Sequence, residues 1–190
     1  NQTARKYSQH FTRSFYTITD DGEYNVVLAE DGVWAIKSRS TGPIFPTGAN
    51  RPLTQTMHIR VLWKPQSGSK PDAPSATNAI IDWYVRSNDS GGGLDHLHYR
   101  GVGFVAIYES RNESRFVIRN ARMELTDSSG RLQDPLGGAS ITGSFLALRD
   151  DSQVTTALNV LHDEMAVASP AMPMQTGAHD GPPPRVPVGP

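Results

Sequence analysis

Apolar and polar side chains alternate along much of this chain, and this period of two limits its fold more than any other feature. A strand with one buried and one solvated face has this pattern, whereas a helix repeats its apolar residues about every three to four positions. The clearest alternations place apolar residues at Met57, Ile59, Val61 and Trp63, at Ile81, Trp83 and Val85, and at Ala121, Met123 and Leu125. These segments are predicted to be strands of an antiparallel sheet.

Weaker runs of the same kind bring the expected number of strands to about eight. They lie at 11–19, 23–30, 33–39, 95–109 and 139–148. Asp21-Gly22 and Asp31-Gly32 separate the first three runs, and such pairs supply the positive φ angles of tight hairpins. The first three strands are therefore expected to form a meander, and the chain an antiparallel β-sandwich or barrel.

Two C-terminal segments depart from this pattern. Apolar residues at spacings of four, three and four follow an N-cap cluster at 150–152, which predicts one helix over 152–166. Beyond it, residues 168–190 hold seven of the fourteen prolines, including Pro182, Pro183 and Pro184, so we expect an extended tail. The predicted organisation is an N-terminal arm (1–10), a single β-domain (11–166) and a proline-rich tail (167–190).

Large aromatic residues in the predicted strands are expected to pack inside the sheet. Trp63, Trp83, Phe104 and Tyr108 have positions consistent with an interior. Trp34 has the opposite parity from its apolar neighbours, which places it at a rim.

Charge and composition exclude several classes of protein. The 18 basic and 19 acidic side chains give a net charge of -1, which offers no electrostatic basis for a nucleic-acid binder or a polybasic membrane clamp. No cysteine is present, so disulfides, thiolate zinc sites and cysteine nucleophiles are excluded. No apolar run approaches the roughly 18 residues of a spanning helix, so no transmembrane segment is expected.

Catalytic motifs are missing from the sequence. The serines near glycine lack the Gly-x-Ser-x-Gly spacing of a nucleophile elbow. The glycines at 91–93 are not followed by a P-loop lysine, so they indicate a hairpin loop. We therefore predict a protein that is not an enzyme and needs no cofactor.

His96 and His98 form the most suggestive chemical pattern. Histidines at i and i+2 of a strand project from one face and could share a metal ion, with His58 or Asp82 as a further ligand. The alternative is that both histidines lie on an outer, solvated surface. Asp82 likewise has two interpretations: a carboxyl group inside a barrel with a raised pKa, or one that faces water. The oxygen-rich turn at 127–130 could bind calcium or close on itself.

Long connections are expected at one end of the sheet. In an up-and-down order, the segments 40–53, 87–94 and 127–138 would gather at a single rim, which would be the binding face. Ile44 and Phe45 lie between prolines in the first of these segments. They would either serve as exposed contact anchors or fold back to plug the end of the barrel.

These features together favour a non-catalytic binding or structural β-domain. It would contact protein partners, or further copies of itself, through Trp34, Ile44 and Phe45 at the rim and through Pro182–Pro184. The alternatives are a subunit of a symmetric shell or fibre of the jelly-roll type, and a barrel that binds an apolar small ligand.

The first residue is Asn1 rather than methionine, which suggests that an upstream segment has been removed. A signal peptide or a lipoprotein leader with a lipid anchor would fit, as would polyprotein cleavage. The expected location is the cell envelope or the exterior, where the triplets at Asn1, Asn88 and Asn112 could be glycosylated.

Overall fold

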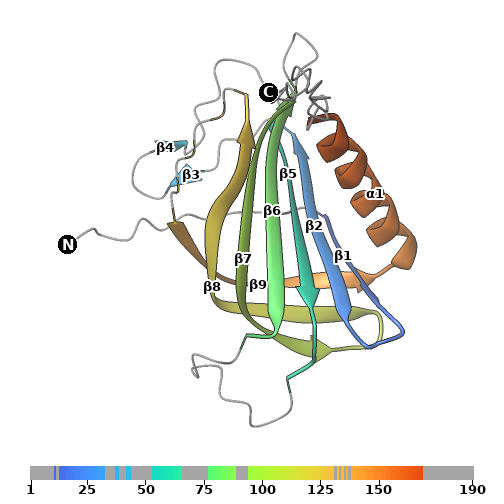
Figure 1. Ribbon diagram of the computed structural model, residues 1–190. Helices are drawn as coiled ribbons and strands as arrows, with labels where there is room; N and C mark the ends of the chain where they lie inside the picture. The colour runs from blue at the N-terminus through green and yellow to red at the C-terminus, as the bar shows by residue number, and fades with distance from the viewer. Residues whose placement is uncertain are drawn as a thin grey trace, which may run out of the picture.

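The computed structural model describes residues 11, 13–32, 37–38, 42–43, 53–65, 77–88, 94–130, 132, 134, 136 and 138–168. Within these ranges the protein is a β-barrel with one helix against its outer wall (Figure 1). The predicted arm (1–10) and nearly all of the predicted tail (167–190) lie outside them. None of the described helical residues form a helix long and apolar enough to cross a membrane.

Seven of the described strands form the barrel, which confirms the all-β prediction and selects the barrel from its two alternatives. They are β1 (Arg13–Ile18), β2 (Tyr24–Gly32), β5 (Leu53–Val61), β6 (Ala79–Asn88), β7 (Leu94–Glu109), β8 (Glu113–Ser129) and β9 (Gly138–Arg149). The run predicted at 33–39 contributes only β3 (Lys37–Ser38), which pairs with β4 (Gly42–Pro43) in a separate sheet. The barrel therefore has one strand fewer than expected.

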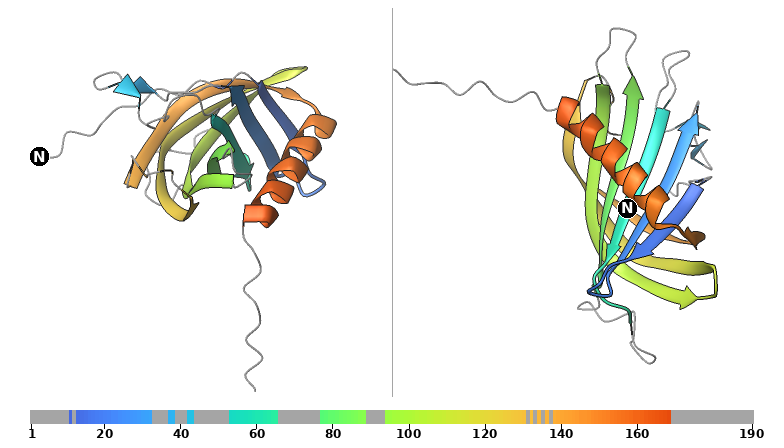
Figure 2. Two further views of the ribbon diagram at one scale, coloured as in Figure 1. Left: turned by 90° about the horizontal axis from the view of Figure 1, so that it is seen from above. Right: turned by 90° about the vertical axis from the view of Figure 1, so that its right-hand side faces the viewer.

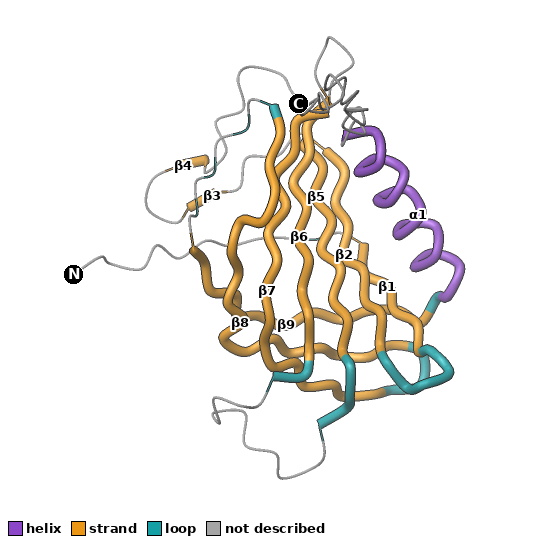
Figure 3. Tube along the Cα trace, viewed as in Figure 1, coloured by secondary structure: helices purple, strands orange, loops and turns teal. Residues whose placement is uncertain are grey.

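Neighbouring strands of the barrel follow one another in the chain, so the barrel has an up-and-down order (Figure 3). The meander predicted for the first three runs holds only for β1 and β2, because β2 pairs next with β5 and β3 pairs with β4 outside the barrel. Consecutive strands alternate in direction, and an odd number of them leaves the first and last running the same way. β1 and β9 accordingly close the barrel as a parallel pair. In the described part of the chain, two residue pairs make this closure, Phe15 with Leu148 and Tyr16 with Arg149.

Of the two predicted hairpin turns, only the first exists. Gly22 has a φ of 82°, and its N–H donates to the carbonyl oxygen of Thr19 over 2.9 Å, which closes the turn between β1 and β2. Asp31 and Gly32 instead lie within β2, where Gly32 pairs with Leu53 of β5. The ladder between β2 and β5 thus continues through the second Asp-Gly pair, and the prediction of a turn there was wrong.

The inward-facing residues of the strands form one hydrophobic core. Trp83 is 2% exposed and belongs to this core, as predicted. Phe104 is also buried, but it has the parity of the exposed Val102 and Tyr108 and does not belong to the core cluster. Trp63 and Tyr108 are 43% and 57% exposed, so their predicted interior positions were wrong. β5 ends at Val61, before Trp63, and the strand parity no longer applies there. Tyr108 follows the buried Ile107 and so lies on the opposite face of β7.

A β-bulge in β8 exchanges the two faces of this strand. Phe116 and Ile118 are buried before the bulge, and Ala121 and Met123 are buried after it. The register with both neighbouring strands shifts at this point, and Asn120 adopts a φ of 50°. The extra residue lets even positions face the core in the first half of β8 and odd positions in the second.

The predicted helix is present as α1 (Asp151–Ala168), and Asp150 caps it by accepting the N–H of Gln153 over 3.0 Å. It crosses the outer face of the barrel obliquely, as the side view in Figure 2 shows, and contacts β1, β2 and β7. Val154 and Leu161 bury the apolar face of the helix. Arg86, on the outer face of β6, forms an ion pair with Glu164 of α1.

Candidate functional site

The partner-binding residues predicted from sequence lie outside the described residues. They are Trp34, Ile44, Phe45, Pro182, Pro183 and Pro184. The strand ends that bound the three long connections do lie at one end of the barrel, because these connections are alternate ones in a meander. The ends of the first two connections pair directly, as Gly32 with Leu53 and Asn88 with Leu94. The third connection begins after Ser129, which pairs with His96 of β7 at the same end.

His96 is a buried side chain with both ring nitrogens occupied. Its Nε2 lies 3.0 Å from Oδ2 of Asp127, and its Nδ1 lies 2.7 Å from Oγ of Ser129. The hydrogen bond from His96 holds the pKa of Asp127 below its usual value, despite an opposing contribution from burial. His96 therefore ties β7 to the end of β8.

His98 pairs with a different carboxylate on the same outer face. Its Nε2 lies 2.9 Å from Oδ1 of Asp82, and its ring stacks on Tyr84 with centroids 4.1 Å apart. Burial raises the pKa of Asp82, but the hydrogen bond from His98 and the charge of Arg100 outweigh it, so the net pKa is lowered. Asp82 is thus an ionised group on the outer wall.

The predicted metal ligands do not converge. His96 and His98 lie on one face of β7, as expected, but each is held by its own carboxylate. His58 pairs with Asn25 over 3.1 Å. In the part of the chain that the structure describes, no three His, Cys, Asp or Glu side chains are grouped so that they could hold a metal ion.

One edge of β9 offers a different kind of site. β9 pairs with β8 along its length, but with β1 only at Leu148 and Arg149. Among the described residues, no strand pairs with this second edge from Gly138 to Ala147. Within the described ranges, the barrel is therefore closed at one end of β9 and has an open sheet edge from Gly138 to Ala147.

The backbone bonds at the end of β9 identify which residues serve the open edge. Arg149 donates its N–H to Asn112, on the β8 side, and Asp150 donates to Tyr16 of β1. Backbone groups of successive residues point to opposite sides of a strand. Ser144 and Leu146, which share the parity of Asp150, therefore direct their N–H and C=O groups toward the open edge.

Apolar side chains border this edge on both faces of the sheet. Ile141 and Phe145 pack against the core but are only partly buried, and Phe145 stacks on Phe116 at 5.4 Å. On the outer face, Leu146 is 55% exposed and Leu148 is also exposed. An added strand could cover apolar surface that β9 leaves partly solvated.

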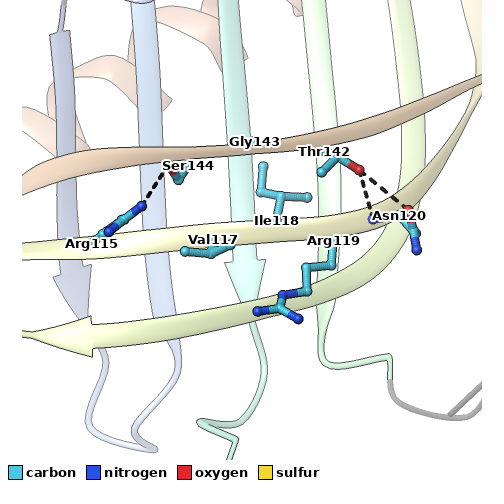
Figure 4. A pocket seen from close by; sticks show the side chains of 8 residues that line it. All are labelled: Arg115, Val117, Ile118, Arg119, Asn120, Thr142, Gly143 and Ser144. Carbon is cyan, nitrogen blue, oxygen red and sulfur yellow. Dashed lines mark hydrogen bonds between the residues drawn. The ribbon is translucent and has the colours of Figure 1, made fainter. Parts of the chain in front are cut away.

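A shallow pocket of about 440 Å³ lies beside the edge, between β8 and β9 (Figure 4). Arg115 reaches across it to Ser144, with 3.4 Å between Nη2 and Oγ, and Arg119 extends along its lower side. A Cβ atom added to Gly143 would meet no atom within 4 Å. No described carboxylate pairs with either arginine, so the pocket carries unneutralised positive charge.

Sequence reasoning missed both the edge and the pocket. A strand's pairing partners are set by the closure of the barrel, which hydrophobic alternation does not specify. One signal was present: from Gly138 to Leu148 the chain has no charged residue and no proline. Natural edge strands usually carry such residues as protection against pairing.

No protein-family model, curated protein or solved structure matches this chain.

Proposed function

We propose that this protein is a non-catalytic binding barrel that accepts an extended segment of a partner protein as an additional strand along β9. The observation that carries the proposal is the unpaired edge of β9 from Gly138 to Ala147. Addition of a strand to a sheet edge is a general mode of peptide recognition, in which main-chain hydrogen bonds supply affinity.

The composition of β9 supports the proposal that another strand covers this edge when the protein functions. A long edge without charges or proline invites indiscriminate pairing, and natural proteins avoid this unless the edge is occupied. Ser144 and Leu146 offer the partner's backbone two donors and two acceptors. A segment in extended conformation satisfies them with its own peptide groups, which a helix cannot do because its backbone groups bond internally.

The side chains around the edge define the partner's sequence pattern. Side chains that point into the barrel would meet Ile141 and Phe145, so these positions of the partner should be apolar. Side chains on the outer face would lie near Arg115 and Arg119, so these positions should include aspartate or glutamate. The partner strand is therefore an alternation of apolar and acidic residues.

A second copy of β9 fits this pattern poorly. β9 has no acidic residue between Gly138 and Leu148. Pairing two β9 edges about Ser144 would also bring the two copies of Arg115 toward each other, and like charges repel at such an interface. The charge distribution thus favours a different protein over self-association.

The proposal can be tested by photo-crosslinking in the cells that produce the protein. A crosslinking amino acid at Ser140, an exposed edge residue, should capture one dominant partner whose crosslinked peptide alternates apolar and acidic residues. Val102, exposed on β7 and paired there with both β6 and β8, is the matched control position.

Two substitutions at one residue then separate backbone pairing from side-chain contact. Leu146→Pro removes the edge N–H without removing a bond to β8, whereas Leu146→Ala keeps it. The crosslink at Ser140 should fall to the level of Val102 in the proline variant and persist in the alanine variant. Equal capture in both variants would exclude strand addition.

A further inference from the structure

We propose that the inner wall of the barrel, on β5 and β6, binds a small uncharged molecule that carries amide or hydroxyl groups on an apolar body. Three polar side chains there are almost fully buried: Gln55 at 3% exposed, and Trp83 and Ser87 at 2% each. Both amide atoms of Gln55, Nε1 of Trp83 and Oγ of Ser87 have no hydrogen-bond partner among the residues that the structure describes. We call Gln55, Trp83 and Ser87 the inner polar cluster.

The strand register brings these side chains together. Gln55 pairs with Val85, which lies between Trp83 and Ser87 on the same face of β6. Trp83 and Ser87 are therefore the two diagonal neighbours of Gln55, a relation that leaves Cβ atoms about 7–8 Å apart. All three have the parity of the core residues Met57 and Val85, so they face the lumen.

Burial of polar atoms without partners is unfavourable, and buried groups in native proteins are nearly always satisfied by protein, water or a ligand. A single orphaned atom is ordinary, but four in adjacent side chains indicate a common bonding partner. The cluster lies on the walls of a barrel, and the lumen of an up-and-down barrel is a frequent place for small ligands. The cluster therefore marks a ligand site on its own physical grounds.

The chemistry of the wall selects the class of ligand. The indole N–H and the amide NH₂ are donors, the amide oxygen is an acceptor, and the serine hydroxyl can be either. Trp83 also stacks on Tyr99, with centroids 5.1 Å apart, which provides an apolar and aromatic surface. A ligand with a neutral amide or alcohol group beside a ring satisfies both.

Nearby carboxylates argue against an anionic ligand. Asp95 is buried on the same wall, where it pairs with Ser87 across the strands. Tyr99 donates its hydroxyl to Asp134 over 2.6 Å. Burial, and next the hydrogen bond to Asp134, raise the pKa of Tyr99, which keeps this phenol neutral. A negatively charged ligand would meet these acidic groups without a compensating cation in the inner polar cluster.

This site is separate from the proposed strand site. Gln55, Trp83 and Ser87 lie on β5 and β6, and β7 and β8 stand between them and β9 in the sheet. The two proposals can therefore fail independently. Leu146→Pro should abolish binding of the partner strand but leave ligand binding at the inner polar cluster unchanged.

The test is a titration of the full chain by two-dimensional ¹H–¹⁵N NMR with three probes of similar shape. Benzamide and benzyl alcohol carry the neutral groups that the cluster requires, and benzoate is the matched anion. The Trp83 indole resonance, assigned by its loss in Trp83→Phe, and the Gln55 side-chain amide should shift with both neutral probes and stay in place with benzoate.

Variants then show whether the cluster itself binds the probes. Gln55→Leu replaces the amide with an apolar group of similar size. It should lower the affinity for benzamide by about tenfold, the factor expected for loss of a hydrogen bond. Ser87→Ala should weaken it to a lesser degree. Ala139→Ser on β9, outside the cluster, is the control and should leave the affinity unchanged.

Three results would overturn the proposal. The first is that neither neutral probe moves the Trp83 indole resonance up to its solubility limit, which would assign the unpartnered atoms to bound water only. The second is that benzoate shifts it as strongly as benzamide. The third is that a correctly folded Gln55→Leu variant binds benzamide as well as the unaltered protein does.

Discussion

Arg86 of β6 and Glu164 of α1 form an ion pair across the interface between the barrel wall and the helix. The arginine side chain is nearly buried, whereas the glutamate is 41% exposed. Arg86 also donates to Oγ1 of Thr56 over 2.9 Å. The helix thus covers a charged residue of the sheet and supplies much of its neutralising charge.

Removal of the helix carboxylate should therefore destabilise the protein. Glu164→Gln leaves Arg86 covered but removes the charge of this carboxylate, and we expect a loss of about 1–3 kcal/mol in the free energy of unfolding. Urea denaturation measures the change. The double variant Arg86→Met with Glu164→Leu should recover most of that loss, because it removes both charges from the interface. A double variant that is less stable than Glu164→Gln would contradict this explanation.

Trp63 and Trp83, which the alternation pattern both placed in the interior, should contribute differently to the stability of the protein. Trp83→Ala creates a cavity in the core and should cost about 3–5 kcal/mol of unfolding free energy. Trp63→Ala removes a half-exposed side chain beyond the end of β5 and should cost less than about 1 kcal/mol. Thermal or urea unfolding of the two variants checks the difference. Similar losses would mean that Trp63 is buried in solution.

Gly101 on β7 and Gly143 on β9, the two strands that flank β8, should tolerate alanine to different degrees. A Cβ atom at Gly101 would lie 2.0 Å from the backbone oxygen of Arg122, so Gly101→Ala requires β7 and β8 to separate. We expect a loss of about 1–3 kcal/mol, as for overpacked cores. Gly143→Ala, with open space around the added carbon, should change stability by less than about 0.5 kcal/mol. Comparison of the urea midpoints distinguishes the two.

Stability should fall as the pH is lowered from 7 to 5, because of His58. Burial lowers the pKa of this histidine in the folded protein, and the opposing charge of Asp82 only partly compensates. The unfolded chain therefore binds a proton more readily. The free energy of unfolding falls as the pH drops through the ordinary histidine pKa of 6.5. Asp82, whose folded pKa is lowered, adds a further loss only below about pH 4.

Substitution of the histidine tests this assignment. His58→Gln keeps a side chain that can bond to Asn25 but cannot titrate, so it should reduce the change in urea midpoint between pH 7 and pH 5. His162→Gln, at an exposed position on α1, is the control and should leave that change intact. An unaltered pH response in His58→Gln would place the effect elsewhere in the protein.

The alternation of apolar residues was sufficient to predict the strands of the barrel and the inward faces of β5, β6 and the second half of β8. It did not fix the order of the strands, and the third strand of the expected meander lies outside the barrel. The helix was equally predictable, because its spacing and its Asp150 cap are local features. Errors arose where the pairing of strands did not follow the preference of the local sequence. Gly32 suits a turn but pairs within β2, and Trp63 continues the alternation of β5 after the strand has ended.

The candidate sites were harder to predict because they depend on contacts between distant parts of the chain. The pairing of His98 with Asp82 follows from the register of β6 and β7, which no local pattern fixes. The open edge of β9 depends on how few residues of β1 meet it. Gln55 and Ser87 lie one alternate position beyond the apolar runs that begin at Met57 and end at Val85, so the pattern gave no sign that polar groups would be buried there.

The bulge in β8 accommodates one surplus residue, so the length of this strand is as important as its composition. Deletion of Asn120 would place Phe116, Ile118, Ala121 and Met123 at every second position, and all four would still face the lumen. One residue inserted after Ala121 would have the opposite result, because Met123 would then meet water and Arg122 would be driven into the lumen. A single codon gained there would turn the end of a strand inside out, although no contact residue had been changed.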